Sequence, residues 1–186
     1  MLSLRKSRPL MGCIAMLGCF FILCGCEEKG SFDLSSLIPP EGKYDVRIIR
    51  DHWGVPHIYG KTDADVAYGL GWAQTEDDFK HTYETMLMAR GLYASEAGMK
   101  GAPFDFLVHL FGFREIVDDA YETQLSPEMR AVCDAYADGF NHYAALHPEK
   151  ANPAVLPASG KDIVTGFAMR TPFFFGMEKQ IRKLMG

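Results

Sequence analysis

Cysteine is nearly absent from most of this chain. Four of the five cysteines lie within residues 1–26, and only Cys133 follows them. A single thiol cannot form an internal disulfide, so we expect none in the body of the protein. The sequence also lacks a basic excess, since 19 Lys and Arg face 24 Asp and Glu and give a net charge of −5. This balance argues against a nucleic-acid partner, because nucleic-acid binders normally carry a basic surface.

Several motifs of catalysis and metal binding are missing as well. There is no HExxH motif and no pair of histidines four residues apart, and His81, His109 and His142 fall in separate expected helices. We therefore expect no histidine-based metal site. The absence of GxSxG excludes the nucleophile elbow of α/β-hydrolases. Cys133 lies on the apolar stripe of an expected helix, which favours a buried structural thiol over a nucleophile.

Two further patterns favour packing and solvation over chemistry. Residues 69–71 (Gly-Leu-Gly) lack the third glycine and the preceding strand of a dinucleotide-binding loop, so we expect close helix packing there. Residues 76–78 (Glu-Asp-Asp) are consecutive, and consecutive side chains on a helix point in different directions. They therefore indicate a solvated face rather than a catalytic pair of carboxylates.

The first 26 residues have the pattern of an export signal. Basic residues near the start precede an apolar run, Leu10–Cys24, that is too short to span a bilayer. Residues 23–26 (Leu-Cys-Gly-Cys) resemble a bacterial lipobox, which implies cleavage after Gly25 and lipid attachment to Cys26. The alternatives are a plain secretory signal or an uncleaved anchor. We expect an exported, periplasmic lipoprotein anchored to the membrane by its lipid, with residues 27–43 as the tether.

A β-hairpin pattern opens the body of the protein. Apolar and polar side chains alternate over residues 44–49, which is the period of a strand. Gly54 and Pro56 punctuate a turn, and residues 57–59 follow as a second short strand. Two short strands joined by such a turn predict a hairpin.

Helical patterns fill most of the remaining sequence. Thr62 and Asp65 form a capping-box pattern, and we expect the helix that they begin to run to about Arg90. We expect residues 103–117 to form an apolar helix. Ser126 and the proline after it begin another helix, which ends near residue 147. The expected fold class is therefore α+β, mostly helical with a β-hairpin.

Five motifs follow one another along this body. They are VRIIRD at 46–51, GVPHIY at 54–59, GWAQTED at 71–77, ARG with EAG between 89 and 98, and AYADGFNHY at 135–143. Together they resemble the start of the penicillin acylase family of N-terminal-nucleophile amidohydrolases, which includes acyl-homoserine-lactone acylases. A departure occurs at residues 76–79, where Glu-Asp-Asp-Phe stands in place of a common Asp-Arg-Leu-Phe. The resemblance covers residues 44–186 and implies the incomplete N-terminal (α-chain) portion of an αββα N-terminal-nucleophile hydrolase fold.

The resemblance implies a precursor that cuts itself at a Gly–Ser bond. The new N-terminal Ser then attacks the amide carbonyl of an acyl small molecule, such as a penicillin or an acyl-homoserine lactone. Its own α-amino group, with a pKa of about 7.7–8.0, serves as the general base. The one Gly–Ser step in this sequence ends at Ser31, before the first strand, so Ser31 is expected to be a tether residue. The nucleophile is thus expected on a downstream β-chain, with no catalytic residue in this chain and no activity of this chain alone.

The last segment resembles a family region that serves the acyl pocket and a structural Ca²⁺. By this resemblance Met169 and Phe173 contact the acyl group, and Glu178 is a Ca²⁺ ligand, a role that suits a hard carboxylate oxygen. No cofactor is implied for catalysis. The alternative is that Met169 and residues 173–175 are core and that Glu178 is a surface acid. For the whole protein, the alternatives to an acylase are a non-catalytic lipoprotein or binding module, or a truncated fragment of the same scaffold.

Overall fold

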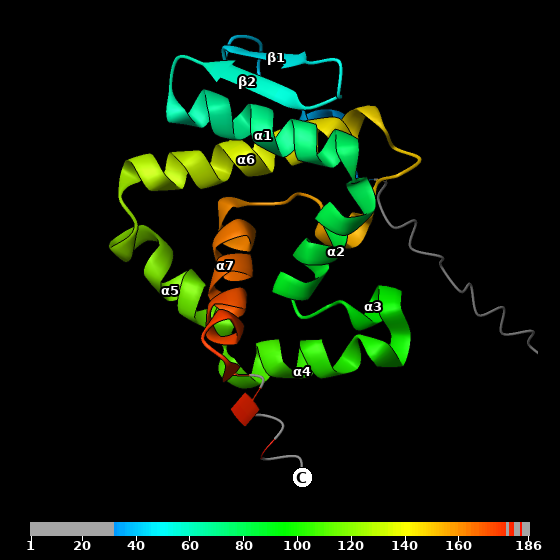
Figure 1. The fold of residues 1–186 in the computed structure, drawn as a ribbon, viewed down its shortest axis with the longest axis vertical. Helices are drawn as coiled ribbons and strands as arrows, with labels where there is room; N and C mark the ends of the chain where they lie inside the picture. The colour runs from blue at the N-terminus through cyan, green and yellow to red at the C-terminus, as the bar shows by residue number, and fades with distance from the viewer. Residues whose placement is uncertain (1–31, 178, 181–182, 184–186) are drawn as a thin grey trace, which may run out of the picture. The chain divides into compact units, whose positions relative to one another are not determined.

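The computed structural model describes residues 32–177, 179–180 and 183. These residues form an antiparallel hairpin and a set of helices (Figure 1). The strands are β1 (Val46–Arg50) and β2 (Pro56–Gly60), and the helices are α1 (Asp63–Asp77), α2 (Phe79–Ala89), α3 (Ala94–Ala97), α4 (Ala102–Phe111), α5 (Phe113–Gln124), α6 (Pro127–Leu146) and α7 (Gly160–Phe174). Short 3-10 helices are η1 (Leu34–Leu37), η2 (Gly98–Lys100) and η3 (Pro153–Val155). The predicted class, mostly helical with a β-hairpin, is confirmed.

The predicted export signal and the start of the predicted tether lie outside the described residues. Later in the tether, η1 forms, and Leu34 and Leu37 pack against the main core. No helix among the described residues is both long enough and apolar enough to cross a bilayer.

The hairpin lies on helix α1. Its strands pair antiparallel, with Ile48 opposite Ile58, and Gly54 in the turn adopts a φ of +83°, which favours glycine. Gly69 of α1 faces the strands, and a Cβ at this position would lie 2.7 Å from side-chain carbons of Val46 and Ile58. The missing side chain therefore lets the hairpin approach the helix closely.

Helices α1 and α6 lie side by side, and glycines bring their backbones together (Figure 1). A Cβ on Gly71 of α1 would overlap the carbonyl oxygen of Tyr136 in α6. The reverse holds for Gly139 of α6, where a Cβ would overlap the carbonyl oxygen of Tyr68 in α1. The close packing predicted from the Gly-Leu-Gly sequence is confirmed, and it offsets the roughly 1 kcal/mol that each helical glycine costs relative to Ala.

The prediction of one continuous helix from Thr62 to Arg90 is wrong, because the segment forms two helices, α1 and α2. Its capping box forms as predicted, with Thr62 and Asp65 bonding reciprocally. At Asp78, however, the backbone leaves the helical region with a φ of −150° and a ψ of 77°. The Asp78 carboxylate accepts the backbone N–H of His81 at 3.1 Å and so starts α2 afresh. A short acidic side chain competes for backbone donors in this way, which ends one helix and caps the next.

The apolar helix predicted at residues 103–117 is also divided. Gly112 adopts a left-handed conformation, with a φ of +63° and a ψ of 36°, and separates α4 from α5. Glycine takes this conformation without the penalty of a Cβ, so it commonly ends helices. In contrast, the helix predicted to begin after Ser126 is confirmed, because the Ser126 hydroxyl accepts the N–H of Met129 at 3.2 Å and α6 ends at Leu146.

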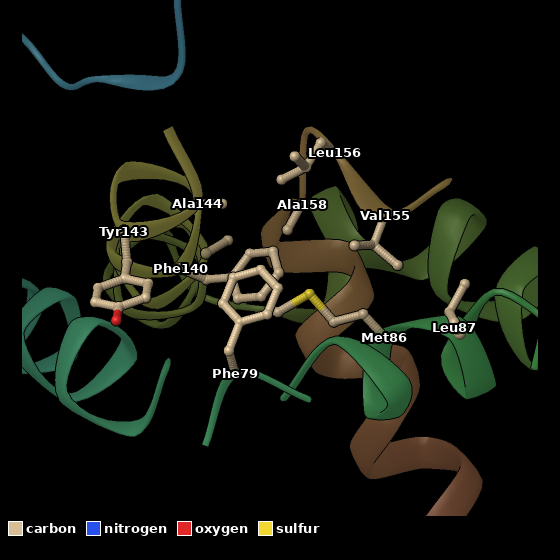
Figure 2. Packing of buried hydrophobic residues seen from close by; sticks show 10 residues of the cluster. Phe79, Met86, Leu87, Phe140, Tyr143, Ala144, Val155, Leu156 and Ala158 are labelled. Carbon is tan, nitrogen blue, oxygen red and sulfur yellow. The ribbon is translucent and has the colours of Figure 1, made fainter. Parts of the chain in front are cut away.

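The main core joins α2, α6 and the loop that carries η3. Figure 2 shows the rings of Phe79 and Phe140 stacked, with centroids 5.8 Å apart, beside Met86. Val155 reaches the same cluster from the loop and is fully buried. Burying a side chain such as Phe or Val contributes about 1.5–3 kcal/mol. The core therefore fixes the loop that leads into α7.

Candidate functional site

A cleft of about 760 Å³ lies where α1, α2, α6 and α7 meet, and we call it the α7 cleft. Helix α7 supplies Ile163, Gly166, Phe167 and Arg170, which recur at helical spacing. The opposite walls include Met86 of α2 and Met129, Val132, Cys133 and Tyr136 of α6. A mostly apolar hollow of this size can hold the apolar part of a small molecule.

Charged groups stand at the rim of the α7 cleft. At the end of α1, an Arg50 Nη2 lies 2.5 Å from Glu76 and 2.7 Å from Asp77. The next residue, Asp78, accepts the N–H of His81, which lowers the pKa of its carboxyl. All three carboxylates are exposed by 43–53%, so the solvated face predicted for residues 76–78 is confirmed.

On α7 the exposed rim carries the opposite charge, while Asp162, which also lines the cleft, is completely buried. Arg170 is exposed, and its Nη2 donates to the hydroxyl of Thr85 at 3.3 Å. The rim therefore carries Asp77, paired with Arg50, and Asp78 near the junction of α1 and α2, and Arg170 on α7. An apolar floor between rims of opposite charge suits an amphipathic or polar-ended ligand better than a plain hydrocarbon.

Hydroxyl and thiol groups in the cleft are engaged or shielded. Cys133 is buried as predicted, and burial raises the pKa of its thiol, which keeps the thiol protonated. The hydroxyls of Thr82 and Thr85 donate to the carbonyl oxygens of Asp78 and His81, at 2.8 and 2.9 Å. These lining groups can make binding contacts, but nothing in their geometry activates them as nucleophiles.

Met169 and Phe173, predicted to contact the acyl group, lie one turn apart on α7 and share a face. Met169 is buried in a small cluster with Val108 of α4 and Phe113 of α5. Phe173 is half-buried, and neither side chain lines the α7 cleft, which lies on the neighbouring face of the helix. Beyond them, Phe174 is 87% exposed. Their role in acyl binding stays a prediction.

The predicted lipid-bearing Cys26 and the predicted Ca²⁺ ligand Glu178 both lie outside the described residues. Across the part of the chain that the structure describes, no cluster of three or more His, Cys, Asp or Glu side chains could hold a metal ion. His81, His109 and His142 lie on α2, α4 and α6, the separate helices expected for them. The described residues therefore do not by themselves make up a Ca²⁺ site.

Sequence reasoning missed the α7 cleft and its charged wall. The signal was present, because Ile163, Phe167 and Arg170 follow helical spacing along α7. It was weak, because the facing residues come from three helices that are far away in the sequence. The hydrogen bond that Tyr136 donates to Gln74 joins two lining residues 62 positions apart and leaves no local pattern in the sequence.

Comparison with known proteins gives a consistent result. The family model described as penicillin amidase matches residues 45–174. Acyl-homoserine lactone acylase QuiP of Pseudomonas syringae pv. syringae (strain B728a) is 27% identical over 165 residues, covering 85% of this chain and 20% of that protein. Penicillin G acylase of Escherichia coli is 30% identical over 156 residues, covering 82% of this chain and 16% of that protein.

A solved structure shows the same fold. Thermostable penicillin G acylase from Alcaligenes faecalis superposes with a TM-score of 0.58 at 22% identity, covering 71% of this chain and 74% of that chain. The predicted N-terminal-nucleophile hydrolase fold is thus confirmed for this N-terminal portion. The chain spans about a fifth of the length of the curated relatives that it matches.

Proposed function

The chain belongs to the penicillin amidase family, and from this premise we propose that it is the N-terminal part of an exported acylase that hydrolyses a linear amide bond. The observation that carries the proposal is the family match over residues 45–174, with relatives named as acylases of homoserine lactones and of penicillins. The substrate is a small molecule with an amide-linked acyl group, of the penicillin or acyl-homoserine-lactone type.

The proposed reaction uses a serine at the start of a second chain, downstream of this one in the same precursor. Its hydroxyl oxygen attacks the amide carbonyl carbon, and its α-amino group takes the hydroxyl proton. The carbon–nitrogen bond then breaks, and the amine leaves with that proton. Water next attacks the acyl-enzyme ester, which releases the free acid and restores the serine.

This chain has two proposed roles in that enzyme. Met169 and Phe173 contact the acyl group from α7, and the apolar surface around α4 and the end of α7 contacts the downstream chain. Support for the second role comes from exposure, because Phe106, Leu110 and Phe174 are 60% or more exposed. Large exposed apolar side chains are typical of protein interfaces when they gather in one patch. By itself, this chain is proposed to be inactive.

Two further parts of the proposal concern residues outside the described structure. Glu178 is a proposed Ca²⁺ ligand, and because one carboxylate is not a site, the other ligands must come from elsewhere in the precursor. Cys26 is the proposed site of lipid attachment, which would hold the exported protein at the membrane. Cys26→Ala is expected to abolish palmitate labelling, and continued labelling would refute the lipid anchor.

The experiment that tests the proposed function uses the purified precursor, with all the sequence that its gene encodes. Penicillin G and acyl-homoserine lactones of several chain lengths are incubated with it, and release of acid and amine is followed by mass spectrometry. We expect self-cleavage and turnover of at least one substrate. Replacing the serine that begins the second chain with alanine is the matched control, which should cleave no amide. A protein that neither cuts itself nor releases any acid would contradict the proposal and favour a non-catalytic role.

A further inference from the structure

Asp162 is a carboxylate at the first turn of α7 whose side chain is completely buried. Its oxygens accept hydrogen bonds from Arg90 at 2.8 and 2.9 Å and from Arg114 at 2.5 Å. The backbone N–H and the hydroxyl of Ser159 donate to it as well, at 2.8 and 2.9 Å. Burial by itself would raise the pKa of Asp162, but the bonds and charge of Arg90 and the bonds from Ser159 outweigh it and lower that pKa. The group is therefore a charged, fully bonded carboxylate, and we call it and its two arginines the Asp162 node.

The two arginines come from different helices. Arg90 ends α2 and also donates to the carbonyl oxygens of Ala154 and Pro157, at 2.9 and 2.8 Å. Arg114 lies in the first turn of α5. The guanidinium of Arg90 thus bonds both Asp162 oxygens and two loop carbonyls, which is the fork geometry that arginine supplies and lysine cannot. One carboxylate ties α2, α5 and the preceding loop to the start of α7.

Helix α6 holds the same segment from another side. The buried side chain of Asn141 pairs with both backbone groups of Ala158, each at 2.8 Å. Asp134 accepts the N–H of Gly160 at 3.1 Å and the hydroxyl of Tyr121 at 3.0 Å. The first turn of α7 is therefore fixed by bonds from three helices.

The position of this first turn determines where the rest of α7 lies. Met169 follows Asp162 by seven residues, which is about 10 Å along a helix axis. Phe113 packs against Met169 while its neighbour Arg114 bonds Asp162. Consecutive residues of α5 therefore hold α7 at two points, and a change at the node would tilt the helix and displace Met169 and Phe173.

A buried ion cluster of this kind does little for net stability. Desolvating the charges costs several kcal/mol per ion, so apolar replacements are often as stable. What the cluster supplies is one defined arrangement, because five donors converge on two oxygens. Because the cluster lies at the first turn of α7, it fixes the position of the helix that carries Met169 and Phe173, the residues proposed to contact the acyl group.

We propose that the Asp162 node is a positioning device that holds α7 so that Met169 and Phe173 select the acyl group. This inference rests on the proposed acylase function. Asp162 and Arg90 touch no substrate in this account, and they act through the helix. A small displacement of positioning groups can change a rate by orders of magnitude, so loosening the node should alter the discrimination between acyl groups.

The test measures the ratio of kcat/KM for a phenylacetyl amide to that for a dodecanoyl amide in the full precursor. Asp162→Asn removes the charge with little change in shape, and Arg90→Lys keeps the charge but loses the fork. Each is expected to shift the ratio by about tenfold. A merely structural loss lowers the active fraction and scales both substrates equally, so the ratio separates the two roles. Glu122→Gln is the matched control, because it removes an exposed carboxylate of the same helix α5 that pairs with Arg130 of α6, at 3.1 Å, and not with α7. With this variant the ratio should stay within about twofold.

A ratio within about twofold of the wild type in both Asp162→Asn and Arg90→Lys would overturn the proposal. If Asp162→Asn does not fold, Arg90→Lys and Arg114→Lys decide alone. If the wild-type precursor turns over no amide, the proposed function fails, and hydrogen exchange then decides the positioning claim. Exchange of the amides at residues 163–174 should rise by about tenfold in Arg90→Lys while α1 and the first half of α6 stay unchanged. Unchanged hydrogen exchange in α7 of the Arg90→Lys variant would overturn the positioning role of the Asp162 node.

Discussion

Helices α1 and α6 make a closed contact, whereas α4 leaves most of its apolar surface uncovered. In α6, eight residues are buried, and Gly139 lets the backbone touch that of α1. In α4, Val108 is the one buried residue, while Phe106 and Leu110 are 64% and 60% exposed. The contact between α1 and α6 is therefore completed by residues of this chain. The α4 region carries exposed apolar side chains that fit the interface proposed above.

The largest expected effect on the free energy of unfolding comes from a substitution that forces helices α1 and α6 apart. Gly139→Val places a branched side chain against the carbonyl oxygen of Tyr68. We expect a loss of about 3 kcal/mol in the free energy of unfolding, measured by urea denaturation. Gly166→Ala is the matched control, because a Cβ there meets nothing within 4 Å. It should raise stability by roughly 0.5–1 kcal/mol, as for a glycine in a helix interior. Equal losses in both variants would mean that the close α1–α6 contact does not matter.

A smaller effect on the free energy of unfolding is expected from substitutions within α4, which has one buried and several exposed apolar residues. Val108→Ala removes buried methyl groups and should cost about 2 kcal/mol of unfolding free energy in this chain. Leu110→Ala, two residues further on, should cost less than about 0.5 kcal/mol, because Leu110 is exposed. Thermal unfolding of both variants checks the difference. A cost at Leu110 equal to that at Val108 would show that α4 is covered by this chain's own residues.

The smallest expected effect is on the stability of the fold at acidic pH, and it comes from Asp65. Asp65 of α1 accepts the N–H groups of Asp45 and Thr62 at 2.9 and 3.0 Å, and the bond from Asp45, followed by those from Thr62, lowers its pKa. A carboxyl whose pKa is lowered in the folded state stabilises the fold above its unfolded pKa of about 3.9. This contribution is lost as the pH falls through the folded pKa. Unfolding curves of the wild type and Asp65→Asn should therefore converge from about pH 5 toward pH 2. A constant gap between them would contradict the role of the Asp65 charge.

Local signals in the sequence were sufficient for the hairpin, the capping box at Thr62 and the start of α6. Each of these depends on residues a few positions apart, such as Ser126 and the N–H of Met129. The breaks at Asp78 and Gly112 were missed because apolar spacing continues through both. Their own residue types, a short acid and a glycine, were the available signals.

The arrangement around α7 could not be predicted in the same way. Ser159 and Asp162 show a capping-box pattern, which is local. Arg90 and Arg114, however, bond Asp162 across 72 and 48 positions, and nothing in a single sequence connects such distant charges. The face of α7 that carries Met169 also depends on where α4 and α5 lie. The roles of Met169 and Phe173 come from family resemblance and stay predictions.

The most direct test compares hydrogen exchange in residues 1–186 expressed alone with exchange in the self-cleaved precursor proposed above. We expect α1 and α6 to be protected equally in both preparations, because this chain's own residues complete their contact. Residues 102–111 of α4 and the end of α7 should gain protection only when the proposed downstream chain is present. Equal protection of α4 in the two preparations, or no protection of α1 and α6 in the chain alone, would contradict this expectation.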